Sequence, residues 1–220
     1  IGVRDPLGLK PLCLGKRGDS YILASESCAL TAVDAKFVRD ILPGEIVTIT
    51  ENGIKSDSRL IEESKAAHIP HAHCIFEYIY FARLDSTMDN VNIYDARIRA
   101  GKALAASYPV EADLVTGVPD SGLAAAMGYA QACGLPFALA FHKNSYVGRT
   151  FIKPTQKERE SAVHLKLSVL SSVVKGKRLV LIDDSIVRGT TMASLIRMLK
   201  NAGATEVHVR ISSPPFLFHC

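Results

Sequence analysis

Two adjacent carboxylates, Asp183 and Asp184, are the residues best placed to do chemistry, because they directly follow the hydrophobic run 178–182. The residues after them are mostly small or hydroxyl-bearing and lead into a helical pattern. A helix start has free backbone N–H groups and a partial positive charge, and both favour a bound phosphate. Paired carboxylates suit a sugar diol or a hydrated Mg²⁺. The whole string predicts a site for a phosphorylated ribose, whereas an isolated Asp-Asp pair would be equally well explained as a capped turn.

A second polar loop, 118–122, contains Asp120, Ser121 and Gly122 between an apolar run and an Ala-rich helical run. Its backbone amides could hold another phosphate group in the same way. Taken alone, this loop would more often be a plain turn in which Ser121 caps the helix.

A strand and helix alternation in the later part of the chain must position both loops. Strands are predicted at the apolar runs 113–118, 137–141, 178–182 and 205–212. From about residue 191, apolar residues recur at i, i+3, i+4 and i+7, which predicts a helix. The alternation indicates an α/β fold with an open, mainly parallel sheet and helices on both faces. Ligands of such sheets bind beyond the carboxyl ends of the strands, where both loops lie.

The first part of the chain has a different pattern of predicted secondary structure. Short strand-like runs at 21–25 and 45–50, with turn signals at Pro43-Gly44 and Asn52-Gly53, predict antiparallel sheet. The polar stretch 56–73 reads as a connector. We therefore expect two parts, residues 1–68 with the linker and residues 69–220.

The string 180–191 resembles the phosphoribosyl pyrophosphate loop of type I phosphoribosyltransferases. The resemblance implies that Asp183 and Asp184 bind ribose hydroxyls or Mg²⁺. It implies that the 5-phosphate is held by the residues that follow, which are Ser185, Val187, Arg188, Gly189, Thr190 and Thr191. It also implies that Asp120, Ser121 and Gly122 form the pyrophosphate loop, with Ser121 a further partner of the metal.

Four more segments, 4–12, 24–27, 76–83 and 143–151, resemble the glutamine phosphoribosyl pyrophosphate amidotransferases (amidophosphoribosyltransferases). By composition alone, 76–83 would more often be a core strand, whereas 143–151 would equally well be a solvated basic loop or a mobile lid. The resemblance makes the latter a lid, in which Lys143, Tyr146 and Arg149 clamp the substrate. It makes residues 1–68 the C-terminal part of an α+β N-terminal-nucleophile glutaminase domain, and 69–220 a C-terminally truncated transferase domain. Neither Cys13 nor Cys28 is then expected to be the glutaminase nucleophile.

Cys74 and Cys220 fall where iron–sulfur members of that family have cluster ligands. A [4Fe–4S] cluster needs four thiolates, so these two residues alone do not complete one. The resemblance implies a cluster in the intact protein, and a buried free cysteine is the alternative for Cys74.

The composition of the chain gives no indication of a nucleic-acid-binding, membrane or secreted protein. The net charge of +4 is too small to indicate nucleic acid, and no apolar run approaches the roughly 18 residues of a membrane span. Five cysteines without paired spacing, and no secretion signal, predict a cytoplasmic protein.

The resemblance implies that the enzyme forms 5-phosphoribosylamine from phosphoribosyl pyrophosphate and glutamine-derived ammonia, the first step of purine biosynthesis. It also implies feedback by purine nucleotides and a homodimer or homotetramer. Two alternatives stay open. A DNA-binding regulator of this fold would need a winged-helix domain, which is not visible, and a base-salvage phosphoribosyltransferase would not need residues 1–60.

Overall fold

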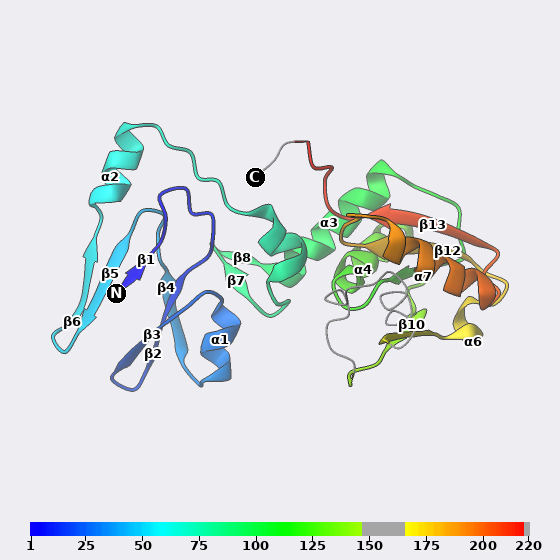
Figure 1. Ribbon diagram of the computed structural model, residues 1–220, viewed down its shortest axis with the longest axis horizontal. Coiled ribbons are helices and arrows are strands. Elements are labelled where there is room, and N and C mark those ends of the chain that lie inside the picture. Colours follow the sequence, from blue (N-terminus) through cyan, green and yellow to red (C-terminus); the bar gives the residue numbers. More distant parts are fainter. Residues whose placement is uncertain (147–165, 218–220) are drawn as a thin grey trace. The chain divides into compact units, whose positions relative to one another are not determined.

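The computed structural model describes residues 1–146 and 166–217, and the chain divides into two compact units, Ile1–Ala96 and Arg97–Cys220 (Figure 1). In the first unit, β1 (Gly2–Val3), β5 (Ile46–Thr50) and β6 (Gly53–Asp57) form one antiparallel sheet. A second antiparallel sheet has the order β3 (Ser20–Ala24), β2 (Cys13–Arg17) and β4 (Lys36–Asp40). The predicted antiparallel content and the hairpin near Asn52-Gly53 are both confirmed.

Short elements complete the first unit: α1 (Ser27–Ala32), α2 (Arg59–Ala66), a π-helical turn η1 (Glu77–Phe81), and the hairpin β7 (Thr87–Met88) and β8 (Val91–Asn92). The segment 76–83 is not the core strand that its composition favours. It forms the π-helical turn η1 instead, and the rings of Phe76, Tyr80 and Phe81 pack against one another with centroids 5.3–5.6 Å apart. Tyr80 and Phe81 remain exposed.

The boundary between the two compact units lies between Ala96 and Arg97, and the division of the chain into domains after residue 68 stays a prediction. Residues 69–92 are tied to the first unit by specific polar contacts. Arg4 makes two hydrogen bonds of 2.8 Å to Asp89, and the Ser86 hydroxyl donates to Glu26 at 2.7 Å. These side-chain contacts span 60 to 85 residues, so composition along the chain does not reveal them.

The second unit contains a parallel sheet of β13 (Glu206–Ile211), β12 (Arg178–Asp183) and β9 (Leu114–Gly117), in that order. A parallel bridge between Val115 and Phe137 extends it on the far side of β9. The predicted strand 137–141 is divided, because only Phe137 joins this sheet. The chain then forms β10 (Phe141–Lys143), which pairs antiparallel with β11 (Leu167–Val169).

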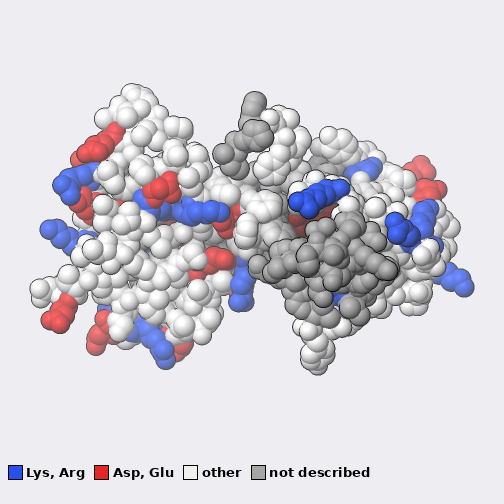
Figure 2. Space-filling model, in the orientation of Figure 1, with Lys and Arg blue, Asp and Glu red and all other residues white. Residues whose placement is uncertain are grey.

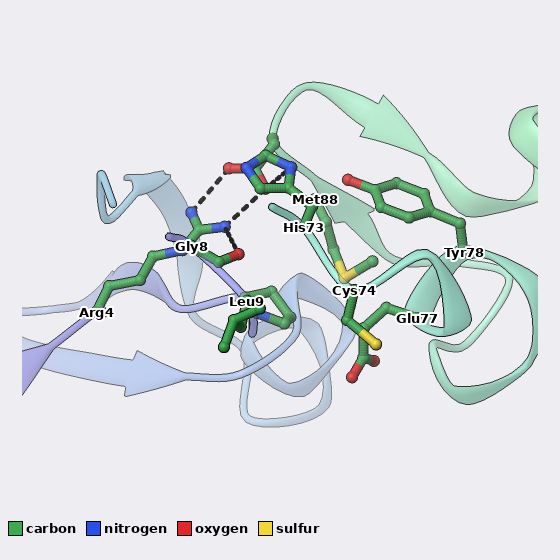
Figure 3. A pocket seen from close by; sticks show the side chains of 10 residues that line it. Arg4, Gly8, Leu9, His73, Cys74, Glu77, Tyr78 and Met88 are labelled. Carbon is green, nitrogen blue, oxygen red and sulfur yellow. Dashed lines mark hydrogen bonds and ion pairs between the residues drawn. The ribbon is translucent and has the colours of Figure 1, made fainter. Parts of the chain in front are cut away.

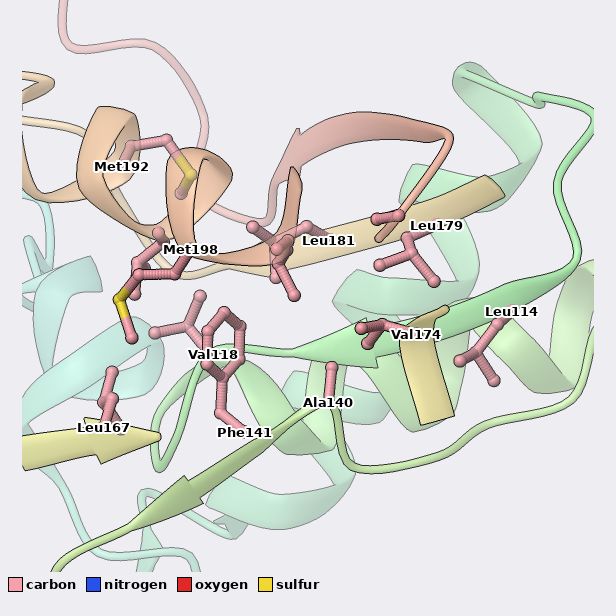
Figure 4. Packing of buried hydrophobic residues seen from close by; sticks show 13 residues of the cluster. Leu114, Val118, Ala140, Phe141, Leu167, Val174, Leu179, Leu181, Met192 and Met198 are labelled. Atoms are coloured by element: carbon pink, nitrogen blue, oxygen red, sulfur yellow. The ribbon is translucent and has the colours of Figure 1, made fainter. Parts of the chain in front are cut away.

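Helices cover both faces of this sheet, as the sequence predicts. The central strand β12 is apolar at consecutive positions, and its side chains alternate between the two faces. Leu179 and Leu181 pack with α7 (Thr190–Asn201) and the short α6 (Ser171–Val174) (Figure 4). Val180 and Ile182 pack with α4 (Gly122–Cys133) and the end of α3 (Ile93–Ser107). All four strand side chains are fully buried, so the sheet's carboxyl edge has a rigid base.

Candidate functional site

Both predicted loops leave the sheet at one edge because β9 and β12 are adjacent and parallel. Ile182 lies opposite Gly117 in the register, and the Val118 N–H donates to the Ile182 carbonyl at 2.8 Å. The two loops therefore start side by side. The structure thus brings together the two sets of residues that the sequence singled out.

Gly122 lets the first turn of α4 approach the end of β12. A Cβ atom at this position would lie 2.6 Å from the Ile182 carbonyl oxygen, which is closer than real Cβ contacts allow. The Gly122 N–H donates to the Val118 carbonyl, and Leu123 N–H donates to Asp120. Because these two amides already have acceptors, the amides left for a pyrophosphate in this loop are those of Asp120 and Ser121.

Asp184 joins the two loops through hydroxyl groups. The residue is 5% exposed, and its two carboxylate oxygens accept hydrogen bonds from the hydroxyls of Ser121 and Ser185. Ser121 occupies the N-cap position of α4 but makes no side-chain cap hydrogen bond. The loop 118–122, considered alone, would more often be a turn in which the Ser121 side chain caps the helix. The structure shows instead that this side chain bonds to Asp184.

The surroundings of Asp183 oppose its ionisation. Burial, and then the neighbouring charge of Asp184, raise the pKa of Asp183 from 3.8 to about 7. Its Oδ1 accepts one hydrogen bond, from the Asp184 N–H at 2.9 Å. A bound cation or the hydroxyls of a sugar would stabilise its ionised form.

The loop from Ser185 to Thr191 opens helix α7. Gly189 takes a left-handed conformation with φ of 73° at the N-cap position, and Ala193 N–H donates to its carbonyl at 2.9 Å. Val187, at 89% exposure, and the neighbouring Arg188 project from the surface. The first helical turn, with Thr190 and Thr191, has the backbone N–H groups that a phosphate requires.

The lid residues are only partly described. Lys143, at the end of β10, forms an ion pair and hydrogen bond with Asp120 of the first loop. The sequence named both residues but gave no signal of their pairing, which joins positions 23 apart. Tyr146 is 99% exposed, and Arg149 lies outside the described residues.

The cysteines that the sequence singled out do not belong to the two loops. Cys74 is half-buried beside a cavity large enough for about one water molecule, which Arg4, His73 and Glu77 also line (Figure 3). Among residues 1–146 and 166–217 no group of three or more His, Cys, Asp or Glu side chains is arranged to hold a metal ion. Burial raises the pKa of the Cys13 thiol to about 11, so it is a poor nucleophile at neutral pH. Cys220 lies outside the described part.

Charge on the surface is mixed. On the face shown in Figure 2, Lys and Arg are interspersed with Asp and Glu in each unit. None of the described helices is both long and apolar enough to span a membrane.

Residues 87–212, which include both loops, match the model of the phosphoribosyl transferase domain. The chain belongs to this family. It is 51% identical to the amidophosphoribosyltransferase of Archaeoglobus fulgidus over 220 residues, covering 100% of this chain and 47% of that protein. It is 52% identical to the amidophosphoribosyltransferase of Bacillus subtilis over 216 residues, covering 98% and 44%. The chain thus spans about half the length of the curated relatives it matches.

Solved structures agree with this assignment. One, described as the allosteric regulatory enzyme of purine biosynthesis, is 50% identical with a TM-score of 0.84, covering 98% of this chain and 45% of that one. Another, the B. subtilis glutamine phosphoribosylpyrophosphate amidotransferase complexed with ADP and GMP, is 50% identical with a TM-score of 0.83, covering 98% and 46%. The type I phosphoribosyltransferase fold and the similarity to amidophosphoribosyltransferases, both expected from the sequence, are confirmed.

Proposed function

We propose that this phosphoribosyl transferase chain contains the transferase site of an amidophosphoribosyltransferase, which makes 5-phosphoribosylamine from phosphoribosyl pyrophosphate and ammonia released from glutamine. The observation that supports it most is the Ser121–Asp184–Ser185 arrangement at the sheet's carboxyl edge. It joins an acidic pair, a helix start and a second loop in one place. The identity of about 50% to amidophosphoribosyltransferases across the whole chain favours this enzyme over other members of the family.

In the proposed reaction, ammonia uses its lone pair to form a bond to C1 of the ribose, and the bond from C1 to the pyrophosphate oxygen breaks. The amine then loses a proton to solvent. Asp183 and Asp184 would hold the ribose hydroxyls, and the start of α7 would hold the 5-phosphate. Negative charge grows on the leaving pyrophosphate, where Lys143 and the free amides of loop 118–122 stabilise it electrostatically.

A magnesium ion fits the chemistry of this edge. Asp183, Asp184 and Ser121 supply oxygen atoms, and Mg²⁺ usually keeps several waters and substrate phosphates among its ligands, so few protein groups suffice. When bound, the ion would neutralise charge on the pyrophosphate. The raised pKa of Asp183 is consistent with a carboxylate that becomes fully ionised when a cation or substrate is bound.

The test is to titrate Mg²⁺-phosphoribosyl pyrophosphate into the protein by calorimetry and then to follow pyrophosphate release after ammonium is added. We expect binding and ammonium-dependent release, and we expect both to be lost in the double variant Asp183→Asn/Asp184→Asn. Near-normal turnover in that variant would sink the assignment. Release that depends on a purine or pyrimidine base instead of ammonium would identify a base-salvage enzyme.

We also propose that residues 1–68 belong to a glutaminase domain. Their two antiparallel sheets and their identity to amidophosphoribosyltransferases support this assignment. The buried, high-pKa Cys13 is not suited to be its nucleophile. Alkylation of Cys13 and Cys28 under denaturing conditions but not native conditions is the expected result, and rapid native labelling of either would contradict it.

For Cys74 we propose ligation of an iron–sulfur cluster in the intact protein, with the other thiolates, Cys220 among them, coming from outside the described residues. A thiol that is half-buried and free supports this. The Cys74→Ser variant of the intact protein, purified without oxygen, should lose bound iron and acid-labile sulfide. The matched Cys133→Ser variant, at the exposed end of α4, should keep both.

The resemblance to amidophosphoribosyltransferases also supports proposals on regulation, assembly and location. We propose that purine nucleotides inhibit the protein, because the B. subtilis relative was solved with ADP and GMP.

We propose that the protein is a homo-oligomer, either a dimer or a tetramer. We also propose that it is cytoplasmic, because the free state of Cys13, Cys28, Cys74 and Cys133 suits a reducing compartment. Inhibition by GMP in the ammonium assay and light scattering of the purified protein test the first two statements.

A further inference from the structure

Neighbouring residues of loop 118–122 engage different partners. The Ser121 hydroxyl donates to Asp184, at the proposed ribose and metal side of the site. Asp120 instead pairs with Lys143 of β10. The loop therefore links the acidic pair of β12 to the one described lid cation through two consecutive side chains.

Lys143 is fixed at its backbone by strand pairing, and its side chain is held by the ion pair with Asp120. The Lys143 position pairs with Leu167 in the β10–β11 ladder, and the Asn144 N–H donates to Lys166 at 2.8 Å. Further back, the Ala140 N–H donates to the buried Thr116 hydroxyl of β9 at 3.0 Å. Because the backbones are fixed, the freedom that remains lies in the lysine's four-carbon side chain and in its choice of anion.

An anion entering the site can reach this ion pair. The Asp120 side chain is 67% exposed and the Lys143 side chain is 34% exposed. A solvent-exposed ion pair contributes little to folding, so stability alone gives no reason for its position beside the pyrophosphate loop. Asp120 also adds a third carboxylate to an edge that already has Asp183 and Asp184, and carboxylates so close to a diphosphate oppose its binding.

We infer that Asp120 is a positioning residue that holds Lys143 beside the loop before substrate binds and competes with the diphosphate for it. The inference rests on the proposed function. On binding, the ammonium group of Lys143, which has three N–H donors, transfers at least part of its hydrogen bonding from Asp120 to the diphosphate. The carboxylate then limits how tightly the product pyrophosphate is held, which favours its release.

The experiment compares the wild-type protein with Asp120→Asn, Lys143→Gln and the double variant, using calorimetry with Mg²⁺-pyrophosphate and, separately, ribose 5-phosphate. Asp120→Asn should bind pyrophosphate about two- to fivefold more tightly, the size expected for releasing one exposed ion pair. Lys143→Gln should bind it more weakly. In the Lys143→Gln background, at least half of the gain from Asp120→Asn, measured as log Kd, should disappear, because the two residues act together.

Control variants separate this role from a general charge or folding effect. Asp120→Glu keeps the negative charge and should bind pyrophosphate with the affinity of the wild type. Asp113→Asn makes the same charge change at the opposite end of the sheet, where Asp113 pairs with Arg178 at 3.0 Å, and should leave pyrophosphate affinity unchanged. The unfolding midpoint of Asp120→Asn should equal that of the wild type.

Three results would overturn the inference. Unchanged or weaker pyrophosphate binding by Asp120→Asn would show that the carboxylate does not compete for Lys143. An equal gain in the Lys143→Gln background would show simple repulsion that does not involve the lysine. Binding of ribose 5-phosphate by the wild type without binding of pyrophosphate would refute this inference alone, whereas binding of neither ligand would also refute the proposed function.

Discussion

Replacing Asp183 by Asn should stabilise the folded protein at pH 8, although it should abolish substrate binding. Asp183 is the last residue of β12, directly after four fully buried residues, and it lies beside Asp184, and both circumstances oppose its ionisation. An amide of nearly the same shape has no charge to bury. Its carbonyl oxygen can still accept the 2.9 Å hydrogen bond from the Asp184 N–H.

The size of the effect follows from the pKa. Burial and the Asp184 charge raise the pKa of Asp183 from 3.8 to about 7. Between these values the folded protein holds a proton that the unfolded chain has lost, so stability falls as the pH rises through this window and stays low above it. At roughly 1.4 kcal/mol per pH unit, the full cost above pH 7 is roughly 4 kcal/mol. At pH 5 it is only roughly 1.5 kcal/mol, because Asp183 is then protonated in the folded protein.

Urea unfolding followed by circular dichroism, for both proteins at pH 5 and pH 8 and without divalent cations, measures the difference. We expect the Asn variant to be more stable at both pH values and its advantage to grow by roughly 2–3 kcal/mol from pH 5 to pH 8. Asp113→Asn is the matched control, because the Arg178 hydrogen bond lowers the pKa of Asp113. It should be destabilising at pH 8 and less so at acidic pH.

The reasoning would be refuted by an Asn variant that is no more stable than the wild type at pH 8. It would also be refuted by an advantage that shrinks as the pH rises. Either result would mean that Asp183 ionises without cost, and that the crowding of carboxylates at this edge has no energetic consequence. Added Mg²⁺ should reduce the advantage, since it stabilises only the charged form of the wild type.

Three further predictions concern single contacts. Ser121→Ala leaves an oxygen of the buried Asp184 without its donor, and should cost roughly 1–3 kcal/mol in urea unfolding and weaken Mg²⁺-pyrophosphate binding. Gly122→Ala places a methyl group against a β12 carbonyl and should lower the thermal midpoint and the affinity together. Burial opposes the ionisation of Glu45, but hydrogen bonds led by Arg39 lower its pKa to about 2. Glu45→Gln should therefore lose roughly 3 kcal/mol at pH 7, and progressively less as the pH falls from 4.5 toward 2.

Much of the second unit could be predicted because its information is local. The apolar run 178–182 forms a central strand, and the polar residues after it face a ligand edge simply because parallel strands end together. Helix α7 follows from its period of apolar residues, which predicts a start near residue 191, close to the observed start at Thr190. In each case the pattern lies within about a dozen neighbouring residues.

The features that sequence patterns missed depend on contacts between distant segments. One exception is local: the aromatic turn 77–81 has the composition of a strand but forms a π-helical turn, in which the rings of Phe76 and Phe81 pack edge to face. The polar cluster of Arg4 and Asp89 holds the hairpin of β7 and β8 in the first unit across 85 positions. The pairing of Asp120 with Lys143 belongs to the same class, because neither residue's own neighbourhood specifies it.

The packing of the second unit explains why the two carboxylates can lie side by side at the site. The rigid base of β12 and its covering helices holds Asp183 and Asp184 together despite their mutual repulsion, because the burial of apolar side chains exceeds the cost of one crowded carboxylate. A cation and an anionic, hydroxyl-rich ligand would relieve that cost, so part of their binding energy comes from a carboxylate that the fold leaves poorly stabilised. A substitution at this edge that stabilises the ligand-free protein should therefore weaken ligand binding. Asp183→Asn should show both effects in one protein.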